Sequence, residues 1–374
     1  MQYYLEHHFD PDFDHHHLKP AVCSADPVDH YELGYAQNVR KGSLLATWRP
    51  LEEGEVEQVD GRFVFQDKQF PMGAGTEALQ ETPDSLIAAE DGYVFYFQGK
   101  ITVRNLLNVR SDVDFHTGNI HFLGDVAVHG SVRSGFVVEG RSIDVHQVVE
   151  AANVRARRTI HTSAGIKGGG GAVLRAKDKI MVPFCENACL ITQGNTVVKH
   201  SAMHCDIYVG NNLVVGERLV GGRVFCRNVM YVGQALGGGL GETQLVLGYD
   251  PELLREDAKL DERISIVAKG LRKIRNLGRK QDQLTADEKE VRENLKAEMV
   301  NLRLCKRKLW ERINSRKRLE ECRVVVPGKV HPGVEISIGE AYLEVAEPME
   351  DVVFLFNGHD IQVASPAMPN QGKL

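Results

Sequence analysis

Apolar residues recur at a short, fixed interval through the middle of the chain. One ladder has successive intervals of 17, 17, 20, 17, 16 and 17 residues and consists of Val126, Ile143, Ile160, Ile180, Val197, Leu213 and Met230. A second ladder runs in phase with it and consists of Ile120, Val137, Val154, Val173, Leu190, Ile207 and Val224. Many ladder residues are β-branched and have an apolar partner two positions along, which is the spacing of one face of a strand. A period this short predicts one turn of a solenoid per repeat.

The dimensions of such a coil predict a solid core. Seventeen residues at about 3.3 Å each give a perimeter of roughly 56 Å, and inward-pointing side chains fill a coil of that size. The predicted fold class is therefore mainly β, with a β-helix, or β-solenoid, of about 17 residues per coil over residues 109–250. One coil carries four glycines, Gly168–Gly171, and both ladders lengthen there. We predict a bulged turn at these glycines, because the run lacks the GK[ST] ending of a phosphate loop and no helix follows it.

Residues 251–322 have helical periodicity instead. Apolar residues four and three apart, as in a coiled coil, predict a helix from Pro251 that ends between Gly278 and Gln283. A short connection to a second helix makes this segment an antiparallel coiled-coil hairpin inserted into the solenoid. The predicted seam between the two helices consists of Leu260, Ile264, Val267, Leu271, Val291, Leu295, Leu302 and Leu309.

A capping signal marks the start of the second helix. The sequence TADE begins at Thr285 and places Glu288 three residues on, which is the spacing of a capping box. We expect this helix to continue to about Cys322. At 1.5 Å per residue the two helices would be about 46 and 57 Å long.

Short strands and turns are predicted on both sides of these two regions. Residues 1–108 alternate short apolar runs with Gly, Pro and acidic residues, which predicts a small β-rich N-terminal domain. Within it, VRKGSLLA at 39–46 and AAEDGYV at 88–94 resemble half-motifs of barrel-sandwich hybrid domains, without the carrier lysine motif. Residues 323–374 read as return strands that cap the solenoid, because an open solenoid end exposes an unpaired edge.

Charge is unevenly distributed along the chain, whose net charge is −6. By segment it is −10 over 1–108, +2 over 109–250, +7 over 251–323 and −5 over 324–374, so the segments face different partners or each other. There is no apolar run of about 18 residues and no basic-then-apolar start, so neither a membrane span nor a signal peptide is predicted. The seven cysteines have no paired spacing, which favours reduced thiols and a cytoplasmic location.

The order of the segments resembles that of a known family. VDFHTGNIHFLGDVAVHGSVRSGFVVEG leads into IDVHQVVEAANV, then FCENACLITQGNTVVKHSAMHCDIYVG, the helical segment and finally VHPGVEISIG. This arrangement resembles the flagellar assembly protein A (FapA) family, most specifically over residues 113–140. The resemblance implies a bacterial, cytoplasmic β-solenoid protein with a coiled-coil insertion, linked to flagellar or polar assembly. It brings no catalytic residues with it.

A basic surface is the strongest candidate for function. Residues 151–179 contain one acid, Asp178, and seven positive side chains: Arg155, Arg157, Arg158, Lys167, Arg175, Lys177 and Lys179. Stacking of successive coils would concentrate this charge into a stripe. The predicted partner-binding residues are Arg155, Arg157, Arg158, Lys177 and Lys179, and the predicted partner is an acidic protein. A solvated face and an intramolecular contact with the acidic N-terminal domain stay open as plainer interpretations. Nucleic acid is not predicted, because no aromatic residues are interleaved for base stacking.

Three other groups of residues carry potential metal or acid–base chemistry. Near the N-terminus, His7, His8, His15, His16 and His17 lie among Asp10, Asp12 and Asp14, but at the spacing of no fixed metal site. Cys185, Cys189 and Cys205 favour small buried thiols. His129 and His146 each follow a ladder position by three residues and should stack about 4.8 Å apart, as a pH-sensing pair or an inert one. We predict no metal, cofactor or catalytic residue.

These observations favour a non-enzymatic cytoplasmic scaffold or adaptor, with a polar location and homo-oligomerisation left open. One alternative is a self-assembling, cytoskeletal-type solenoid filament. The other is a β-helix enzyme acting on polysaccharides, which would need paired carboxylates along a groove. The candidate acids in the early coils are Asp112, Asp114, Asp125, Asp144 and Glu150. Because Asp114 and Asp144 do not share a ladder phase, we do not predict an enzyme.

Overall fold

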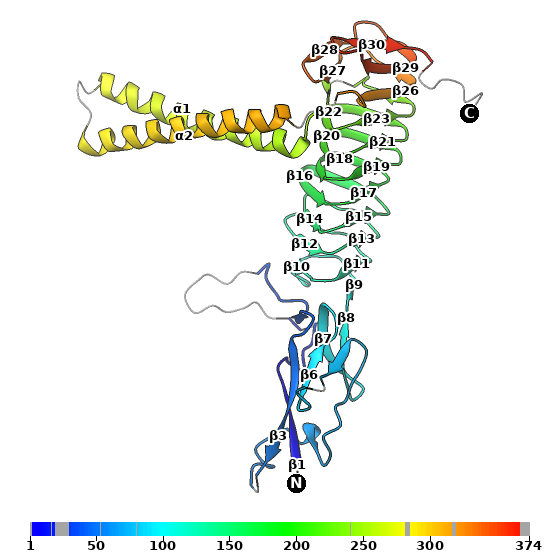
Figure 1. The fold of residues 1–374 in the computed structure, drawn as a ribbon, viewed down its shortest axis with the longest axis vertical. Coiled ribbons are helices and arrows are strands. Elements are labelled where there is room, and N and C mark those ends of the chain that lie inside the picture. Colours follow the sequence, from blue (N-terminus) through cyan, green and yellow to red (C-terminus); the bar gives the residue numbers. More distant parts are fainter. Residues whose placement is uncertain are drawn as a thin grey trace. The chain divides into compact units, whose positions relative to one another are not determined.

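A computed structural model places most of the chain (Figure 1). It describes residues 2–15, 17–18, 30–52, 54–79, 81–239, 241–280, 285–315 and 319–366. Two compact units are distinguished, the first of Met1–Ile191 with Val197–Lys199 and the second of Thr192–Thr196 with His200–Leu374. The structure is mainly β and contains a β-solenoid of about eight turns, roughly 17 residues apart, which confirms the predicted fold class. No helix within the described ranges is both long and apolar enough to cross a membrane.

The first unit begins with a β-rich N-terminal region of two small sheets. Its strands are β1 (Gln2–His7), β2 (Asn38–Val39), β3 (Leu44–Leu51), β4 (Val64–Phe65), β5 (Thr76–Ala78), β6 (Ser85–Ala88), β7 (Gly92–Phe97) and β8 (Lys100–Arg104). Five of them form a sheet in the order β4-β1-β3-β6-β5, and three form a sheet in the order β2-β7-β8. A shared core that includes Leu5, Trp48 and Ile101 holds the region together. Burying each of these side chains contributes about 1.5–3 kcal/mol.

The two half-motifs of the N-terminal region meet in space. The Gly42 N–H donates to the Ala88 carbonyl over 2.7 Å, and the Ala88 N–H donates to the Ser43 carbonyl over 2.9 Å. Gly42 has a φ of +84°, a conformation that glycine adopts without strain. This turn between β2 and β3 therefore has a fixed position, which matters for the side chains of Arg40 and Ser43 described below.

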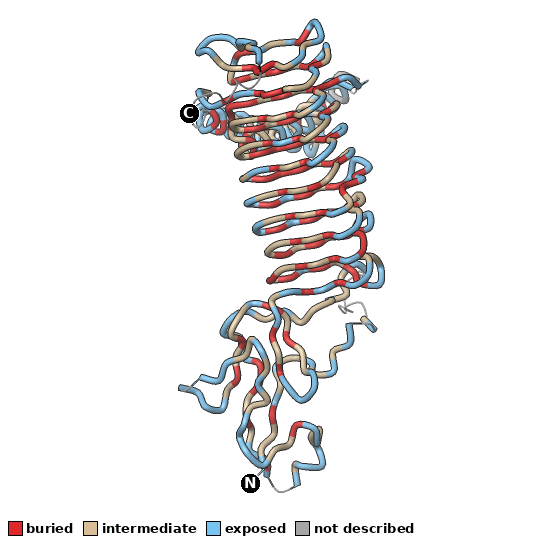
Figure 2. Tube along the Cα trace, turned by 90° about the vertical axis from the view of Figure 1, so that its right-hand side faces the viewer, coloured by how far each residue is buried: buried red, intermediate tan, exposed pale blue. Residues whose placement is uncertain are grey.

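The coils of the first unit stack in parallel. Their strands are β9 (Leu106–Val109), β10 (Ile120–His121), β11 (Asp125–Val128), β12 (Val137–Gly140), β13 (Ile143–Val145), β14 (Asn153–Ala156), β15 (Thr159–Thr162), β16 (Ile166–Ala176) and β17 (Lys179–Val182). The division between the units falls at β18 (Cys185–Thr192) and β19 (Asn195–Val198). Figure 2 shows buried positions recurring in every coil.

The first predicted ladder is correct over these coils. Val126, Ile143, Ile160 and Ile180 are successive register partners, and each is at most 2% exposed. The assignment of Val197 to this ladder is wrong, because Val197 is only half-buried, whereas its neighbour Thr196 is fully buried. A β-branched hydroxyl residue thus occupies a core position that the apolar pattern assigned to the valine beside it.

The second predicted ladder is wrong at two positions in the first unit. Ile120 pairs with Val138 rather than Val137, and Val154 pairs with Leu174 rather than Val173. In both cases two apolar residues are adjacent, and the period alone does not choose between them. Because side chains alternate along a strand, an error of one residue assigns its neighbours to the wrong face.

The glycine run lies inside the long strand β16. Gly169 and Gly170 have φ of +54° and +83°, so the chain turns within that strand. A turn is what the sequence predicted at this position.

The second unit contains coils of its own and the two helices. Its elements are β20 (Ser201–Val209), β21 (Leu213–Val215), β22 (Arg218–Cys226), β23 (Val229–Val232), β24 (Ala235–Leu236), β25 (Thr243–Leu247), α1 (Pro251–Lys280), α2 (Ala286–Ser315), β26 (Arg323–Val330), β27 (Val334–Ile338), β28 (Ala341–Glu344), β29 (Met349–Phe356) and β30 (Ile361–Ala364). After the helices, β26 pairs in parallel with β23, and β27 pairs in parallel with β25. The last strands, β28–β30, pair antiparallel.

The two helices pack along one another and lead away from β20 and β22 (Figure 1). Ion pairs join Arg263 to Glu298 and Arg312 to Glu256, so the helices run antiparallel. The capping box forms as predicted, since the Thr285 N–H donates to Glu288 Oε2 over 2.9 Å and the Glu288 N–H donates to Thr285 Oγ1 over 3.3 Å.

The predicted helical seam needs one correction, and α2 is shorter than predicted. Val291 is 49% exposed and lies outside the seam, whereas Met299 and Ile313 are buried in it. The described part of α2 ends at Ser315, and Cys322 follows a turn at Glu320 and Glu321. The basic residues Arg316, Lys317 and Arg318 lie outside the described residues.

Candidate partner-binding surface and pocket

Three stacked strands of the first unit present charged side chains in one column. Glu139 of β12, Arg155 of β14 and Arg175 of β16 are direct register partners. Each follows a buried residue by one position, so strand alternation points it away from the core. Arg155 Nη1 donates to Glu139 Oε1 over 3.1 Å, and both arginines are exposed. The column therefore has two guanidinium groups and one carboxylate.

Two more basic residues lie at the corner that follows these strands. Arg157 and Lys177 occupy equivalent corner positions, because the residues before them, Ala156 and Ala176, are register partners. Both side chains are exposed. The Arg157 guanidinium reaches along the corner and donates to the Leu123 carbonyl oxygen. The structure thus places Arg157 and Lys177 at equivalent corners of successive coils.

The last two predicted residues have other surroundings. Arg158 Nε lies 3.3 Å from Asp178 Oδ2, in an ion pair between two exposed side chains. Lys179 already belongs to β17, is half-buried and lies opposite Thr159. The five predicted residues are therefore neighbours on successive coils, but they spread over one strand face, a corner and the start of the next face.

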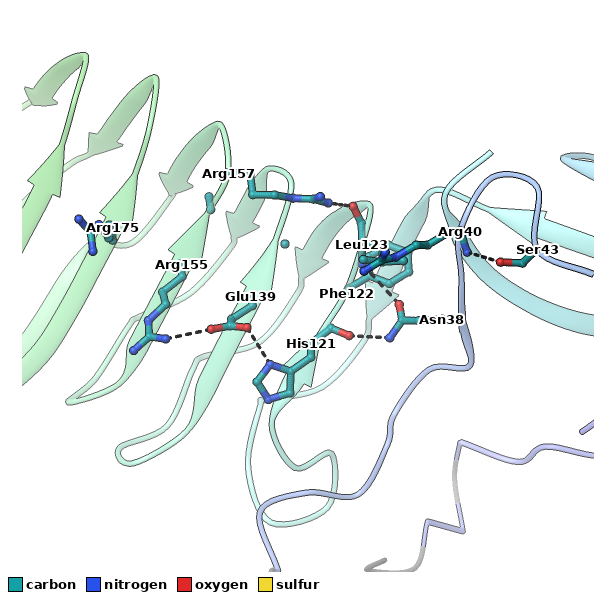
Figure 3. A pocket seen from close by; sticks show the side chains of 12 residues that line it. Asn38, Arg40, Ser43, His121, Phe122, Leu123, Glu139, Arg155, Arg157 and Arg175 are labelled. Carbon is teal, nitrogen blue, oxygen red and sulfur yellow. Dashed lines mark hydrogen bonds and ion pairs between the residues drawn. The ribbon is translucent and has the colours of Figure 1, made fainter. Parts of the chain in front are cut away.

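The N-terminal region forms a wall facing Arg155 and Arg157. Asn38 Nδ2 donates to the His121 carbonyl oxygen over 2.7 Å, and the Leu123 N–H donates to Asn38 Oδ1 over 3.4 Å. The Arg40 N–H donates to Ser43 Oγ over 3.1 Å, which holds the turn that carries the Arg40 side chain. Figure 3 shows Arg40 and Arg157 reaching toward Leu123 from the two sides.

A pocket of about 650 Å³ lies between this wall and the coils. It is lined by Asn38, Arg40, Ser43, His121, Phe122, Leu123, Glu139, Gly140, Arg155, Ala156, Arg157 and Arg175 (Figure 3). Four of these side chains are guanidinium groups and one is a carboxylate. Positive charge gathered in a hollow attracts anions more strongly than the same charge spread over a flat surface.

His121 links the pocket to a segment of the N-terminal region. Its Nδ1 lies 2.9 Å from Glu139 Oε2 and its Nε2 lies 3.2 Å from Glu32 Oε1. Burial disfavours the charged imidazolium, but hydrogen bonds to Glu139 and Glu32 and their negative charges outweigh it, so the pKa of His121 is raised. Burial likewise raises the pKa of Glu139, and the opposing contributions of His121 and Arg155 leave that pKa below its ordinary value. Both groups thus favour the charged state.

Residues 114–122, with the sequence DFHTGNIHF, form the junction between the first coil and this segment of the N-terminal region. Asp114 closes the turn, accepting from the His116 N–H over 2.8 Å. Gly118 has a φ of +67°, and a Cβ placed there would lie 2.7 Å from the Tyr31 carbonyl oxygen. Asn119 Nδ2 donates to Glu32 Oε1 over 2.7 Å. Residues 31–32 of the N-terminal region therefore pack against this stretch of the first coil.

Two family comparisons identify the chain. A family model described as the Flagellar Assembly Protein A β-solenoid domain matches residues 105–361, and a model of the N-terminal region of the same family matches residues 3–99. The chain belongs to the flagellar assembly protein A family. Membership implies a role related to flagellar assembly, and it confirms the resemblance carried by residues 113–140. No curated protein and no solved structure matches the chain.

The sequence interpretation missed the part of the pocket that does not belong to the basic run. Asn38, Arg40, His121 and Glu139 were not singled out. A signal for Glu139 was present, because it shares a ladder phase with Arg155 and Arg175 once Val138 and Leu174 replace Val137 and Val173. Nothing in the periodicity points to Asn38 or Arg40, which come from another part of the chain.

The acids of the early coils have partners of their own. Asp112 and Glu150 both pair with Arg133, at 2.6 and 2.7 Å, and Asp125 pairs with Arg141 at 2.5 Å. The hydrogen bond from Arg141 is the main cause that lowers the pKa of Asp125. The three ion pairs connect successive coils, so these carboxylates act as structural contacts between coils.

The N-terminal histidines and aspartates form separate contacts. His7 packs edge-on against Phe63, and burial lowers its pKa to about 4. Asp12 is bound by Arg62 at 2.6 Å, while Asp14 lies 2.6 Å from His17. Within the described ranges no group of three or more His, Cys, Asp or Glu is placed to hold a metal ion. His16 lies outside the described residues.

The remaining candidates are a cysteine group and a histidine pair. Cys185 and Cys205 are buried as predicted, whereas Cys189 is half-buried. His129 and His146 have ring centroids 4.6 Å apart and meet edge-on at 75°, which confirms that they are neighbours on adjacent coils.

Proposed function

We propose that the chain is a non-enzymatic cytoplasmic scaffold that acts in flagellar assembly by binding an acidic protein partner. The proposed contact surface consists of Arg155, Arg157, Arg158, Lys177 and Lys179. Family membership supports the flagellar role, and the unpaired spacing of the cysteines supports the cytoplasmic location.

The single observation that carries this proposal is the alignment of basic side chains on consecutive coils. Arg157 and Lys177 occupy equivalent corners, and Arg155 and Arg175 are register partners. Like charges stacked at the spacing of a parallel sheet repel one another, by contrast with the Asp125–Arg141 pairing elsewhere in the coils. An acidic partner would relieve that repulsion and would also be steered to the surface.

A charge-reversal triple tests the proposal. The variant Arg158→Glu, Lys177→Glu and Lys179→Glu changes the surface without altering the lining of the pocket. Its matched control carries the same charge change on α1, as Lys269→Glu, Arg272→Glu and Lys273→Glu, where all three residues are exposed. Both variants should melt close to the parent chain, because exposed charges contribute only about 0–1 kcal/mol each and Lys179, the least exposed of the six, is only half-buried.

The readout is capture of flagellar proteins by the immobilised chain, at low and at high salt. We expect the reversed triple to lose an acidic partner that the control triple retains, and the captured partner to dissociate as salt rises. Equal capture by both variants, insensitive to salt, would contradict the proposed surface. Turnover of a polysaccharide would contradict the non-enzymatic role.

Size-exclusion chromatography with light scattering distinguishes the filament alternative from the scaffold. A scaffold of this kind elutes with a mass that does not grow with concentration, whereas a self-assembling filament gives a mass that does.

A further inference from the structure

Among the described residues that line the pocket, positive side chains outnumber negative ones. Arg40, Arg155, Arg157 and Arg175 line it, and among the described lining side chains Glu139 is the one carboxylate. Glu139 accepts from Arg155 and also lies against His121, so it is shared between two cationic groups. An anion bound beside Arg40, Arg155 and Arg157 would therefore meet more positive than negative charge.

The contact of Arg157 points to the same conclusion. In this structure its guanidinium donates to the Leu123 carbonyl oxygen, which is a neutral acceptor. When the acceptor oxygen is anionic, as in phosphate, the attraction between opposite charges adds to the hydrogen bond from a guanidinium. An anion in the pocket would therefore be a better acceptor for Arg157 than the carbonyl that it now contacts.

We propose that this pocket is a binding site for a small organic phosphate, held by Arg40, Arg155, Arg157 and Arg175. Guanidinium forks match the oxygens of a phosphate group, and several of them can share one phosphate chain. The proposal extends the proposed function, because Arg155 and Arg157 also belong to the protein-binding surface, but Arg40 and Arg175 are particular to the pocket.

The size and the lining favour an organic phosphate over the inorganic ion. A volume of about 650 Å³ lies within the range of about 300–1,000 Å³ that small-molecule sites occupy, and it exceeds what one phosphate group fills. Ser43 and Asn38 add polar groups at the wall of the N-terminal region, and Leu123 adds a half-buried apolar side chain. These groups would contact the organic part of the ligand.

The ligand would join two parts of the first unit. Arg40 comes from the turn after β2, whereas the other three arginines come from β14, the corner after it, and β16. Asn38 already bonds to the His121 carbonyl oxygen beside the pocket. Binding should therefore slow hydrogen exchange of the backbone amides in the turn around Arg40, as well as of those in the coils.

Calorimetric titration of the full chain with ATP, inorganic pyrophosphate and citrate tests the proposal. We expect ATP to bind more tightly than pyrophosphate, and pyrophosphate more tightly than citrate, with affinity falling as salt rises. Arg40→Gln and Arg175→Gln should each weaken ATP binding by about tenfold, which corresponds to about 1.4 kcal/mol. Arg158→Gln is the matched control, because it removes a guanidinium on a neighbouring corner that does not line the pocket.

Three results would overturn the proposal. They are the absence of ATP binding at millimolar concentration, citrate binding as tight as ATP binding, and a loss in Arg158→Gln equal to that in Arg40→Gln. Melting curves of each variant confirm that the fold is intact. Failure here is distinguishable from failure of the protein-binding surface, because the Arg158, Lys177 and Lys179 triple should still bind ATP even if it captures no partner.

Discussion

The coils and the helical hairpin both form a core from a repeating apolar pattern, but the two cores accommodate polar residues differently. In the coils of the first unit, ladder residues such as Ile143 and Ile160 are 2% and 1% exposed. In the hairpin, the four-and-three spacing of Leu295, Met299 and Leu302 leads to Lys306, a charged residue at a seam position. The hairpin accommodates this charge by pairing it with acids of the other helix.

The difference follows from what surrounds each core. A coil closes on itself and lies between two others, so its interior has no open side. A seam between only two helices has water along both edges, and a long side chain can keep its charged end there. Lys306 Nζ contacts Asp261 and lies 3.7 Å from Asp257 Oδ1, so one lysine fixes the register of two helices. Burial of polar residues should therefore be costly in the coils and mild in the hairpin.

The largest expected effect is that of a charge placed in the coil core. Ile160→Asp should destabilise the protein by several kcal/mol, because the carboxylate would be buried without a partner. Chemical denaturation followed by circular dichroism measures the change. Val291→Asp in α2 is the control, since that side chain is 49% exposed and should shift stability by no more than about 0.5 kcal/mol. Similar losses in both variants would remove the contrast between the two regions.

The existence of both regions could be predicted from the sequence because each rests on a period. Strand alternation and the 17-residue repeat predicted the coils, and the four-and-three spacing with the Thr285 capping box predicted the helices. What the period did not determine was which of two adjacent apolar residues faces inward, as at Val137 and Val138. That choice depends on hydrogen bonds between coils, for example the pairing of Ile120 with Val138.

The candidate site was predictable only in part, for the same reason. Arg155 and Arg157 came from a run of positive residues that is visible locally. Asn38 and Arg40 approach the pocket from a segment more than 80 residues away from His121 in sequence, as the separation between Asn38 and His121 of 83 shows. Contacts of that kind depend on how the N-terminal region folds onto the first coil, and neither composition nor periodicity carries that information.

A smaller effect is expected where the coil core already contains a hydroxyl group. Thr162 is 1% exposed, and its Oγ1 has no hydrogen-bond partner among the described residues. Thr162→Val keeps the shape and removes the buried hydroxyl, so we expect stabilisation of about 1 kcal/mol, measured by chemical denaturation. Thr159→Val, at a half-buried position of the same strand, should change stability by only a few tenths of a kcal/mol. Destabilisation by Thr162→Val would mean that the coil core tolerates polar groups as the hairpin does.

The smallest effect concerns the acid that faces Lys306. Burial raises the pKa of Asp257, which lies between the helices, and the negative charge of Asp261 adds to this, while Lys306 opposes it. A carboxyl whose pKa is higher in the folded state than in the unfolded state contributes stability below its unfolded pKa and loses it as the pH rises through the folded pKa. At neutral pH Asp257 therefore weakens the hairpin slightly, and Asp257→Asn should strengthen it by a few tenths of a kcal/mol.

Hydrogen exchange of the amides in α1 and α2, measured between pH 4 and pH 7, reports this change. In the parent chain we expect the stability of the hairpin, after correction for intrinsic exchange rates, to decline as pH rises through the folded pKa of Asp257. Asp257→Asn should flatten that decline. Asp261→Asn is the matched control, because it removes a carboxylate that is 53% exposed and contacts the same lysine. A profile that Asp257→Asn leaves unchanged, or makes steeper, would show that Lys306 compensates the buried carboxylate fully, and the hairpin would then satisfy its polar seam residues at no net cost in stability.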